Sequence, residues 1–479
     1  MSNLLILNGT GLSHIDSSFI SSVKANQDFY EKSVSGSKKS GISMIKGKVA
    51  LSSGTIVHDQ VDFLAAFESE IDITSSTIKN VAIETNHVVF HLLSSTFTFT
   101  NSTITNITCP ASTEAIFQVR LESTFTTAGT LSKVTNTTCE FTFLLYSYAY
   151  INDISLDTNS LTTPLMESVE STASFTGITV KNINTTASMI ISVENAASLI
   201  TNSSNFLSAN QIYFYVTGST ATFQNTVFDN QMNIQMKAVY FEDTTATLLG
   251  STFKNLKYTD QGGAVDTLNS NIVVNGSTFL NNFCPIAGAI ALRCEDGNTC
   301  TYSIINSFFT NNSATTNGGA ILYDFYKPTL SGNTYTNNTA LYGPNVAGYP
   351  VKVAAESVPT QVYVSGQTIA TPIKYKLVDA DGLTIATDSD SVITISPVSS
   401  TDKVIGNTDV TVVNGVATFS DITLISKPSA QNINFTISSS NIDLTKLSTA
   451  FGLTTSNTIQ TLKVNFRACV KGEQQNNDM

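Results

Sequence analysis

The residues that could cleave or modify a carbohydrate are few and scattered in this sequence. Glycoside hydrolysis needs two carboxyl groups held close together, one on each side of the scissile bond. Arginine, the base of many polysaccharide lyases, occurs only at positions 120, 293 and 467, and we interpret Arg293 as a solvated charge. Between residues 225 and 345 the acidic residues do not recur at one phase of a repeat: Asp229, Glu242, Asp243, Asp260, Asp266, Glu295, Asp296 and Asp324. The sequence therefore predicts no catalytic residue, and we expect a protein that is not an enzyme.

Histidine and aspartate pairs are the remaining candidates for a metal site. His87 and His91 stand four residues apart on an expected strand and could share a face, but no third ligand lies near them in the sequence. Asp379, Asp381 and Asp388 suggest a calcium loop, yet the EF-hand pattern is absent. The Asp-Gly dipeptide at 381–382 indicates a hairpin turn instead. We predict neither a metal nor a cofactor.

The elements that must position any site are defined by a repeat. An aliphatic or aromatic residue stands two positions before an asparagine again and again, and from Phe228 onward the steps are 25, 26, 30 and 26 residues. Two longer steps, of 46 and 48 residues, each fit two repeats. The pairs are Ile78/Asn80, Ile104/Asn106, Val134/Asn136, Val180/Asn182, Phe228/Asn230, Phe253/Asn255, Phe279/Asn281, Phe309/Asn311 and Tyr335/Asn337.

A glycine motif keeps the same phase. It reads GGAV at 262–265, AGAI at 287–290 and GGAI at 318–321, and the second glycine precedes the next aromatic residue by 16 positions in two of the three cases. The third case is longer because it carries the insert RCEDGNTC. The repeat-defining residues are Phe253, Gly262, Gly263, Phe279, Asn282, Gly288, Phe309, Asn312, Gly318, Gly319 and Tyr335.

A period of this length without a helical pattern is typical of one coil of a parallel β-helix. Successive coils are separated by the spacing of paired strands, so equivalent side chains lie over one another. We expect the hydrophobic residues to form an internal stack and the asparagines to form an amide ladder at a turn. Parallel crossovers are nearly always right-handed, which predicts a right-handed helix. Before residue 200 the alternative is that asparagines follow hydrophobic residues by chance, because asparagine is so common here.

Cysteine placement agrees with this register. Cys109 and Cys139 each follow a repeat hydrophobe by five residues, so they occupy equivalent positions one coil apart, within reach of a disulfide. Cys294 and Cys300 bracket the insert and form the second predicted pair. Two further cysteines, at 284 and 469, have no evident partner. Without CxxC or Cys/His spacing, the six cysteines indicate disulfides in an oxidising compartment and not zinc.

The GGA[IV] and F-x-x-N motifs, here GGAV 262–265, GGAI 318–321, FLNN 279–282 and FTNN 309–312, resemble the polymorphic outer membrane protein repeat of chlamydial autotransporters and its relatives in large protist surface proteins. The resemblance is specific over about residues 225–345. It implies a pectate-lyase-like β-helix on a cell surface, often in an adhesin. Ala287-Gly288 replaces Gly-Gly in one coil, and no autotransporter barrel follows.

A different pattern begins near residue 350. Residues 341–400 contain a single asparagine, at 345, and short alternating strands follow at the spacing of a β-sandwich. We predict a β-helix over 1–348, an Ig-like β-sandwich over 350–466 and, over 467–479, the start of a further cysteine-containing segment. The fold class is therefore all-β.

Composition and charge narrow the function. The net charge of −12 is scattered, so nucleic acid, which needs clustered Lys and Arg, is not an expected partner. The N-terminus lacks the basic region of a signal peptide, and we expect a fragment that is missing both its export signal and its membrane anchor. The sequons, compatible with a secreted glycoprotein, are Asn8, Asn101, Asn106, Asn136, Asn184, Asn202, Asn275, Asn311, Asn337 and Asn434.

The sequence thus predicts a non-catalytic extracellular or cell-surface protein that serves in adhesion or as a structural coat. It would present a long Ser/Thr/Asn-lined face to an unknown surface glycan or protein ligand. The alternative is a carbohydrate-active β-helix enzyme or lectin that acts on polysaccharide. A fold alone does not decide between them.

Overall fold

The computed structural model describes residues 5–8, 12–16, 19–21, 40–45, 48–52, 55–59, 62–82, 88–109, 115–231 and 235–473. The chain divides into two compact units. The first comprises residues 1–291, 300–312 and 329–337, and the second comprises 292–299, 313–328 and 338–479. Within the described residues, no helix has the length and apolar character needed to cross a bilayer. The expected domain boundary near residue 349 stays a prediction.

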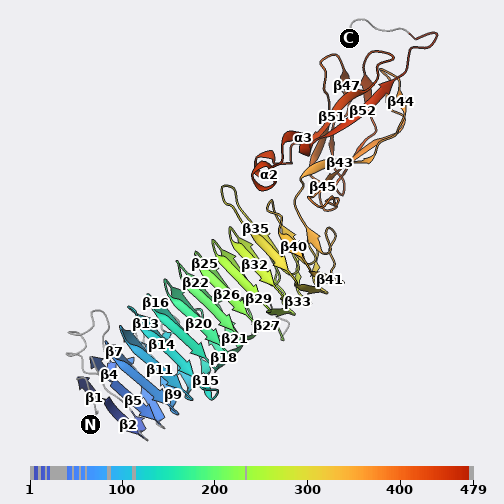
Figure 1. The fold of residues 1–479 in the computed structure, drawn as a ribbon. Helices are drawn as coiled ribbons and strands as arrows, with labels where there is room; N and C mark the ends of the chain where they lie inside the picture. Colours follow the sequence, from blue (N-terminus) through green and yellow to red (C-terminus); the bar gives the residue numbers. More distant parts are fainter. Residues whose placement is uncertain are drawn as a thin grey trace. The chain divides into compact units, whose positions relative to one another are not determined.

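The first unit is a parallel β-helix, drawn from blue to yellow in Figure 1. Each coil adds one strand to each of three sheets, which we name A, B and C. In spatial order, sheet A of this unit contains β1 (Leu5–Asn8), β4 (Ser40–Ile45), β7 (Asp62–Phe67), β10 (Phe90–Leu93), β13 (Ala115–Arg120), β16 (Glu140–Leu145), β19 (Met166–Val169), β22 (Met189–Glu194), β25 (Ile212–Thr217), β28 (Lys237–Glu242) and β31 (Val265–Leu268).

Sheet B contains β2 (Leu12–Asp16), β5 (Lys48–Ser52), β8 (Glu70–Thr74), β11 (Thr96–Thr100), β14 (Thr124–Ala128), β17 (Tyr148–Asn152), β20 (Thr172–Thr176), β23 (Ser198–Asn202), β26 (Thr220–Gln224), β29 (Thr245–Leu249), β32 (Asn271–Asn275), β36 (Tyr302–Ile305) and β40 (Thr329–Ser331). Sheet C contains β3 (Phe19–Ser21), β6 (Thr55–Asp59), β9 (Thr77–Ala82), β12 (Thr103–Thr108), β15 (Ser132–Thr137), β18 (Ile154–Leu161), β21 (Thr179–Thr185), β24 (Asn205–Ala209), β27 (Val227–Asp229), β30 (Thr252–Lys254), β33 (Thr278–Leu280), β37 (Phe308–Thr310) and β41 (Thr334–Thr336). Short strands of the last coils are β34 (Phe283–Cys284), β35 (Ile290–Arg293), β38 (Ser313–Ala314), β39 (Ile321–Tyr323) and β42 (Val346–Ala347).

The repeat hydrophobes form the internal stack that the spacing predicts. In sheet C, Ile78, Ile104 and Val134 pair in register, and the two doubled steps are filled by Leu156 and Phe206. From Phe228 to Phe309 the stacked rings are nearly parallel, with centroids 4.8–5.2 Å apart. Tyr335 continues this stack at 5.3 Å from Phe309. Each fully buried ring contributes about 1.5–3 kcal/mol of hydrophobic stabilisation.

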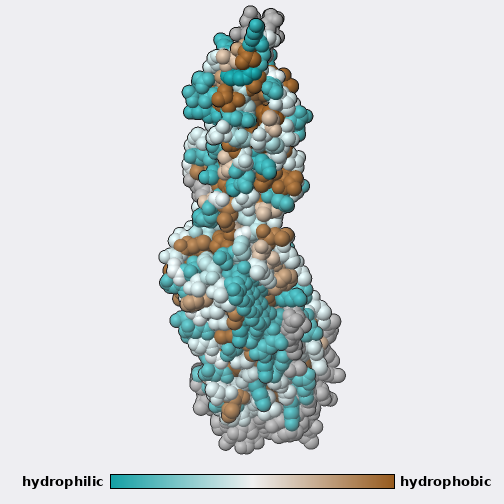
Figure 2. Space-filling view, turned by 90° about the vertical axis from the view of Figure 1, so that its right-hand side faces the viewer, coloured by the Kyte–Doolittle hydropathy of each residue, from teal (hydrophilic) through white to brown (hydrophobic). Residues whose placement is uncertain are grey.

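The asparagines two residues later form the expected ladder, and their backbone explains why asparagine is needed. Asn255, Asn281 and Asn311 have φ between 53° and 58°, a left-handed conformation that asparagine tolerates well. The Nδ2 group of Asn311 donates to Oδ1 of Asn281 (3.2 Å), and the Nδ2 group of Asn281 donates in turn to Oδ1 of Asn255 (3.3 Å). Figure 2 shows a continuous hydrophilic strip (teal) along the side it draws, of the kind that a column of exposed amides produces.

One ladder position departs from the prediction. Asn230 is buried and its φ is not positive, and Asp229 receives the hydrogen bond of Asn255 instead (2.8 Å). A second, buried ladder follows the first: Nδ2 of Asn312 donates to the carbonyl of Phe279 (3.0 Å), and its Oδ1 accepts from Asn282. The Asn-Asn dipeptide therefore serves one exposed and one buried column.

The glycine motif forms a tight corner. Gly262 and Gly318 have φ of 62° and 68°, which favours glycine, although Ala287 adopts 57° at the equivalent position. A Cβ on Gly263 would lie 2.3 Å from the carbonyl oxygen of Gly288, so this second glycine is required by close backbone packing.

The second unit contains a small β-sandwich. Its sheets are mainly antiparallel, with strand orders β43-β45-β49 and β44-β52-β51-β46-β48 and a separate pair β47-β50. The strands are β43 (Lys352–Ser357), β44 (Val362–Tyr363), β45 (Ile373–Val378), β46 (Val392–Pro397), β47 (Lys403–Gly406), β48 (Asp409–Thr411), β49 (Val416–Phe419), β50 (Ile422–Ile425), β51 (Ile433–Ser439) and β52 (Gln460–Phe466).

Two helices that the sequence reasoning missed precede the last strand: α2 (Leu444–Phe451) and α3 (Thr455–Thr458). The carboxylate of Asp443 accepts the amide of Lys446 at the start of α2, and Gly452 ends this helix in a left-handed conformation. Both are standard helix boundary signals.

Candidate functional site

Alternation along the strands leaves the outer faces of the β-helix available to a ligand. In β11, for example, Phe97 and Phe99 are buried, whereas the threonines on either side of them point outward. The inward side chains fill the interior and leave the outward ones to meet solvent. We therefore compared the outer faces of sheets A and B.

The outer face of sheet B is uncharged from β11 to β32. We call this surface the hydroxyl face. Its residues pair in register from coil to coil and are Thr96, Thr98, Thr100, Thr124, Thr126, Ala128, Tyr148, Tyr150, Asn152, Thr172, Ser174, Thr176, Ser198, Ile200, Asn202, Thr220, Thr222, Gln224, Thr245, Thr247, Leu249, Asn271, Val273 and Asn275. Such in-register stacking repeats hydroxyl and amide groups about every 4.8 Å across the sheet.

Two tyrosines rise from the middle of the hydroxyl face. Tyr148 and Tyr150 lie on β17 and are 44% and 42% exposed. They stand two residues apart on one strand, roughly 6.6 Å along it, so both rings lie on the same side of the sheet. Ile200, 42% exposed, continues the Tyr150 column two coils away. A flat polar surface with exposed rings offers both hydrogen bonds and apolar stacking.

The outer face of sheet A is different in kind. It carries a group that we call the carboxylate row: Glu167, Glu194, Tyr215, Tyr240 and Glu242. The Tyr215 phenol donates to Glu242 Oε2 (2.9 Å), and the Tyr215 and Tyr240 rings are stacked with centroids 5.2 Å apart. Acidic groups and half-buried aromatic rings thus share the outer face of this sheet.

Burial raises the pKa of two residues of the carboxylate row, Glu167 and Tyr215. Desolvation raises the pKa of Glu167, and the nearby charge of Glu194 raises it further. Ser192, which pairs with Glu167 in the strand register, donates its hydroxyl to Glu194. Burial also raises the pKa of Tyr215, and its hydrogen bond to Glu242 adds to that shift. A carboxyl group whose pKa is raised, beside another that accepts a hydrogen bond, is a pattern that acid–base catalysis can use.

Sequence reasoning missed the carboxylate row. Within residues 225–345, Asp266 pairs with Tyr240 and Glu242 pairs with Leu268, so these two acidic residues occupy different columns, as the sequence predicts. The signal was present in earlier coils, because Glu167 and Glu194 lie on β19 and β22 of the same sheet.

The cysteines lie as their spacing predicts. Cys109 and Cys139 form a disulfide with a Cα–Cα distance of 5.1 Å. Cys294 and Cys300 are also disulfide-bonded. Cys284 is buried and Cys469 is exposed, each as a free thiol. Burial raises the pKa of the Cys284 thiol to about 12, so it is a poor nucleophile at neutral pH.

The other histidine, aspartate and arginine residues singled out in the sequence do not form a site in the described part of the chain. His91 is a buried residue of β10, and His87 lies outside the described residues. Asp379 Oδ1 accepts the amides of Asp381 and Leu383 (both 2.9 Å), as a turn residue does. Arg293 is the half-buried last residue of β35 and not a solvated loop charge.

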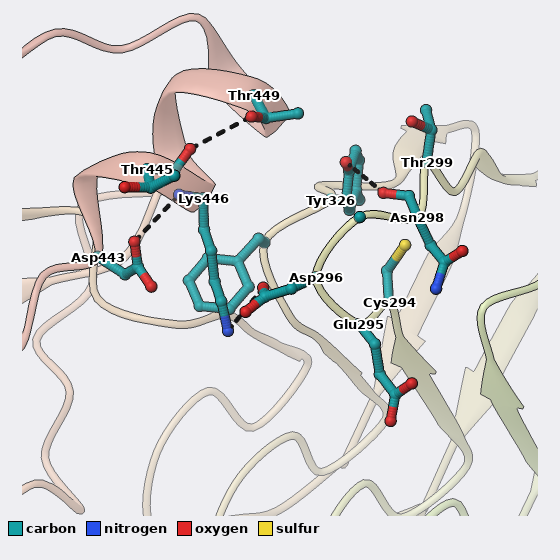
Figure 3. A pocket seen from close by; sticks show the side chains of 12 residues that line it. Cys294, Glu295, Asp296, Asn298, Thr299, Tyr326, Asp443, Thr445, Lys446 and Thr449 are labelled. Carbon is teal, nitrogen blue, oxygen red and sulfur yellow. Dashed lines mark hydrogen bonds and ion pairs between the residues drawn. The ribbon is translucent and has the colours of Figure 1, made fainter.

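A pocket in the second unit lies between the 294–299 loop and α2 (Figure 3). Its cavity volume is about 270 Å³, below the usual range for ligand sites of about 300–1,000 Å³. Its polar groups are engaged with one another: Lys446 Nζ lies 3.0 Å from Asp296 Oδ1 and 4.8 Å from the Phe325 ring centre, and Tyr326 donates to the carbonyl of Asn298 (2.9 Å). This pocket is therefore a structural hollow.

Comparison with known proteins gives no family for this chain. The chain matches no family profile and no curated protein. Solved structures similar to it include a mannuronic acid-specific polysaccharide family 6 lyase from human gut microbiota, with 9% identity over 69% of this chain and 82% of the lyase at a TM-score of 0.35. The A-module of the mannuronan C-5 epimerase AlgE6 of Azotobacter vinelandii is 12% identical over 71% of this chain and 90% of its own, at a TM-score of 0.29.

The surface adhesin PfbA of Streptococcus pneumoniae is 10% identical over 79% of this chain and 91% of its own, at a TM-score of 0.24. At these TM-scores the likenesses carry no argument about the activity of this chain.

Proposed function

We propose that this chain is an extracellular surface protein whose hydroxyl face binds a neutral polysaccharide without cleaving it. The observation that carries the proposal is the uncharged, in-register face of sheet B with Tyr148 and Tyr150 exposed on it. The Cys109–Cys139 disulfide supports an oxidising, extracellular compartment. The resemblance to surface proteins with polymorphic outer membrane protein repeats, with its membrane anchor and Ig-like module, stays part of this proposal.

The hydroxyl face carries no positively charged side chain, which favours a neutral glycan over a polyuronate. A polyuronate carries one carboxylate on each sugar and is usually held by Arg or Lys side chains. The hydroxyl face has none of these, and the neighbouring sheet A carries the carboxylate row. Sugar hydroxyls can instead exchange hydrogen bonds with the Thr and Asn columns, while the two tyrosine rings pack against the apolar faces of sugar rings.

The test is a co-sedimentation assay with insoluble polysaccharides. Purified protein is mixed with cellulose, chitin, β-1,3-glucan and mannan on one side and with calcium-gelled alginate and pectate on the other. We expect retention on at least one neutral polymer and none on the uronates. Retention on uronates alone, or on no polymer, would contradict the proposal.

A second candidate function rests on Glu167 and Glu194. In an inverting glycosidase, a protonated carboxyl donates to the leaving oxygen while a carboxylate on the other side activates water. The raised pKa of Glu167 and the hydrogen bond that Glu194 accepts from Ser192 favour these two roles. New reducing ends in the co-sedimentation supernatant, abolished by Glu167→Gln, would establish this activity and overturn the non-catalytic proposal.

A further inference from the structure

A fully buried ion pair connects two consecutive coils of the β-helix. Lys237 is the first residue of β28, and Asp266 lies on the adjacent strand β31. The Nζ and Oδ2 atoms are 2.9 Å apart, and each side chain is 2% exposed. Removing two charges from water costs several kcal/mol for each ion, which their attraction offsets only with good geometry.

Two other Lys–Asp pairs provide an internal comparison. Lys254–Asp229 and Lys181–Asp157 also join adjacent coils, at 3.1 and 3.0 Å. Their lysine side chains are 35% and 40% exposed, so water screens both pairs. The Lys237–Asp266 pair has the same chemistry and separation but no access to solvent.

The surroundings of the buried pair include two aromatic rings and the glycine corner, and the Cys284 thiol lies close enough to interact electrostatically with both residues. The Tyr258 and Tyr240 ring centres lie 4.5 and 5.9 Å from Lys237 Nζ. A Cβ on Gly262 would lie 2.9 Å from Cβ of Asp266, so the glycine corner closes against this carboxylate. With Nζ and Oδ2 2.9 Å apart and both side chains 2% exposed, the amine and the carboxyl group are held in contact away from bulk water.

We propose that Lys237 and Asp266 form an intramolecular amide bond, an isopeptide cross-link between consecutive coils. The neutral amine attacks Cγ of the protonated carboxyl group, a C–N bond forms, and one C–O bond breaks. The leaving hydroxyl takes the proton released from nitrogen, so one water is expelled. The ammonium and carboxylate together contain every atom of the amide and the water, and no oxidant or other reactant is needed.

The cross-link would join strands whose neighbouring elements are short. In the same coils, sheet C contributes only the three-residue strands β27 and β30. A covalent bond on sheet A would keep these coils together under mechanical load, which a surface protein experiences. The inference does not depend on which ligand the hydroxyl face binds.

The test is the intact mass of the denatured wild-type chain with its disulfides formed. We expect a mass one water lower than the sequence requires. Because a succinimide at the Asp-Gly dipeptides 296–297 or 381–382 also loses water, tandem mass spectrometry of a tryptic digest must assign the site. The expected result is a branched peptide pair joined at Lys237 and Asp266, without cleavage after Lys237.

Two variants serve as controls. Asp266→Ala removes the electrophile and should restore the full mass, and Asp229→Ala removes the partner of the partly exposed Lys254 and should keep the loss of water. A wild-type chain with its full mass, or one cleaved by trypsin after Lys237, would overturn the proposal. Because both of these outcomes are measured on the wild-type protein, they decide the proposal even where a variant does not fold.

Discussion

The outer faces of sheets A and B rest on the same interior but have opposite chemistry. On sheet B, Thr124, Tyr148 and Thr172 follow one another in register without a charge. On sheet A, Phe143, Glu167 and Ser192 occupy such a column, and Tyr215, Tyr240 and Asp266 follow farther along the helix. The inward residues of both sheets are mostly apolar and buried.

This difference shows that inward-pointing side chains maintain the fold, whereas outward-pointing side chains are available for function. Inward positions maintain the coil, so they are restricted to residues that stack well. Outward positions of sheet B remain solvent-accessible and can vary without cost to the core. Outward positions of sheet A are partly covered, so there a charged residue has consequences for stability.

The largest expected effect is on sheet A. Lys237→Ala removes the bonding partner of Asp266, leaves a carboxyl group buried without compensation and should lower the free energy of unfolding by about 3–5 kcal/mol. Lys181→Ala, at the more exposed Lys181–Asp157 pair, should cost about 0–1 kcal/mol. Urea unfolding followed by circular dichroism measures both. Equal losses in the two variants would mean that burial does not distinguish the pairs.

The second-largest expected effect is a loss of stability when a buried serine at a turn is replaced, compared with a threonine on the hydroxyl face. Ser277 is buried, and its Oγ accepts the backbone amide of Ser251 (3.2 Å). Ser277→Ala leaves this amide without an acceptor and should cost about 1–3 kcal/mol. Thr222→Ala, on the hydroxyl face, should change stability by less than about 0.5 kcal/mol. The urea midpoints of the two variants test the contrast, and a larger loss for Thr222→Ala would contradict it.

Substitutions on the outer face of sheet B should weaken polysaccharide binding, whereas substitutions on sheet A should not. Removing both rings with Tyr148→Ala and Tyr150→Ala should weaken retention on the neutral polymer by about tenfold or more, equivalent to about 1.4 kcal/mol. Tyr146→Ala removes an exposed ring at a turn outside this face and should leave binding unchanged. Binding isotherms measure both. Loss of binding in Tyr146→Ala alone would place the site elsewhere.

The smallest expected effect is a pH dependence of the free energy of unfolding, which arises from Glu167 on sheet A. Because the folded pKa of Glu167 is raised, the folded state holds this proton more tightly than the unfolded state does. The resulting stabilisation is fully present below the unfolded pKa, about 4.3, and is lost as pH rises through the folded value. Glu167→Gln should flatten this decline. Urea midpoints measured across this pH range provide the test, and an unchanged slope would show that Glu167 is not its source.

The coil register could be predicted from the sequence because each coil repeats the contacts of the previous one. Phe253, Phe279 and Phe309 occupy one column, so their spacing in the chain directly reports their spacing in the helix. Cys109 and Cys139 were predictable for the same reason. In a repeat of this kind, residues that are one period apart in the sequence are neighbours in space.

The carboxylate row could not be found in this way. Glu167, Glu194 and Glu242 come from coils of unequal length, and their outward positions are not marked by any recurring neighbour. Aligning all coils on sheet A, instead of on the asparagine turn, is the step that would have found them. Helix α2 was missed because its boundary residues, Asp443 and Gly452, lie in a stretch dominated by strand patterns.

The in-register pairing of coils has a genetic consequence. Because each coil meets its neighbours through the same stacked contacts, duplication of one repeat in the gene would insert one more coil without creating a new packing problem. Every such event would lengthen the hydroxyl face by about 4.8 Å and add one row of contacts to a polymer lying along it. Avidity for a long glycan could therefore vary between alleles through repeat number alone.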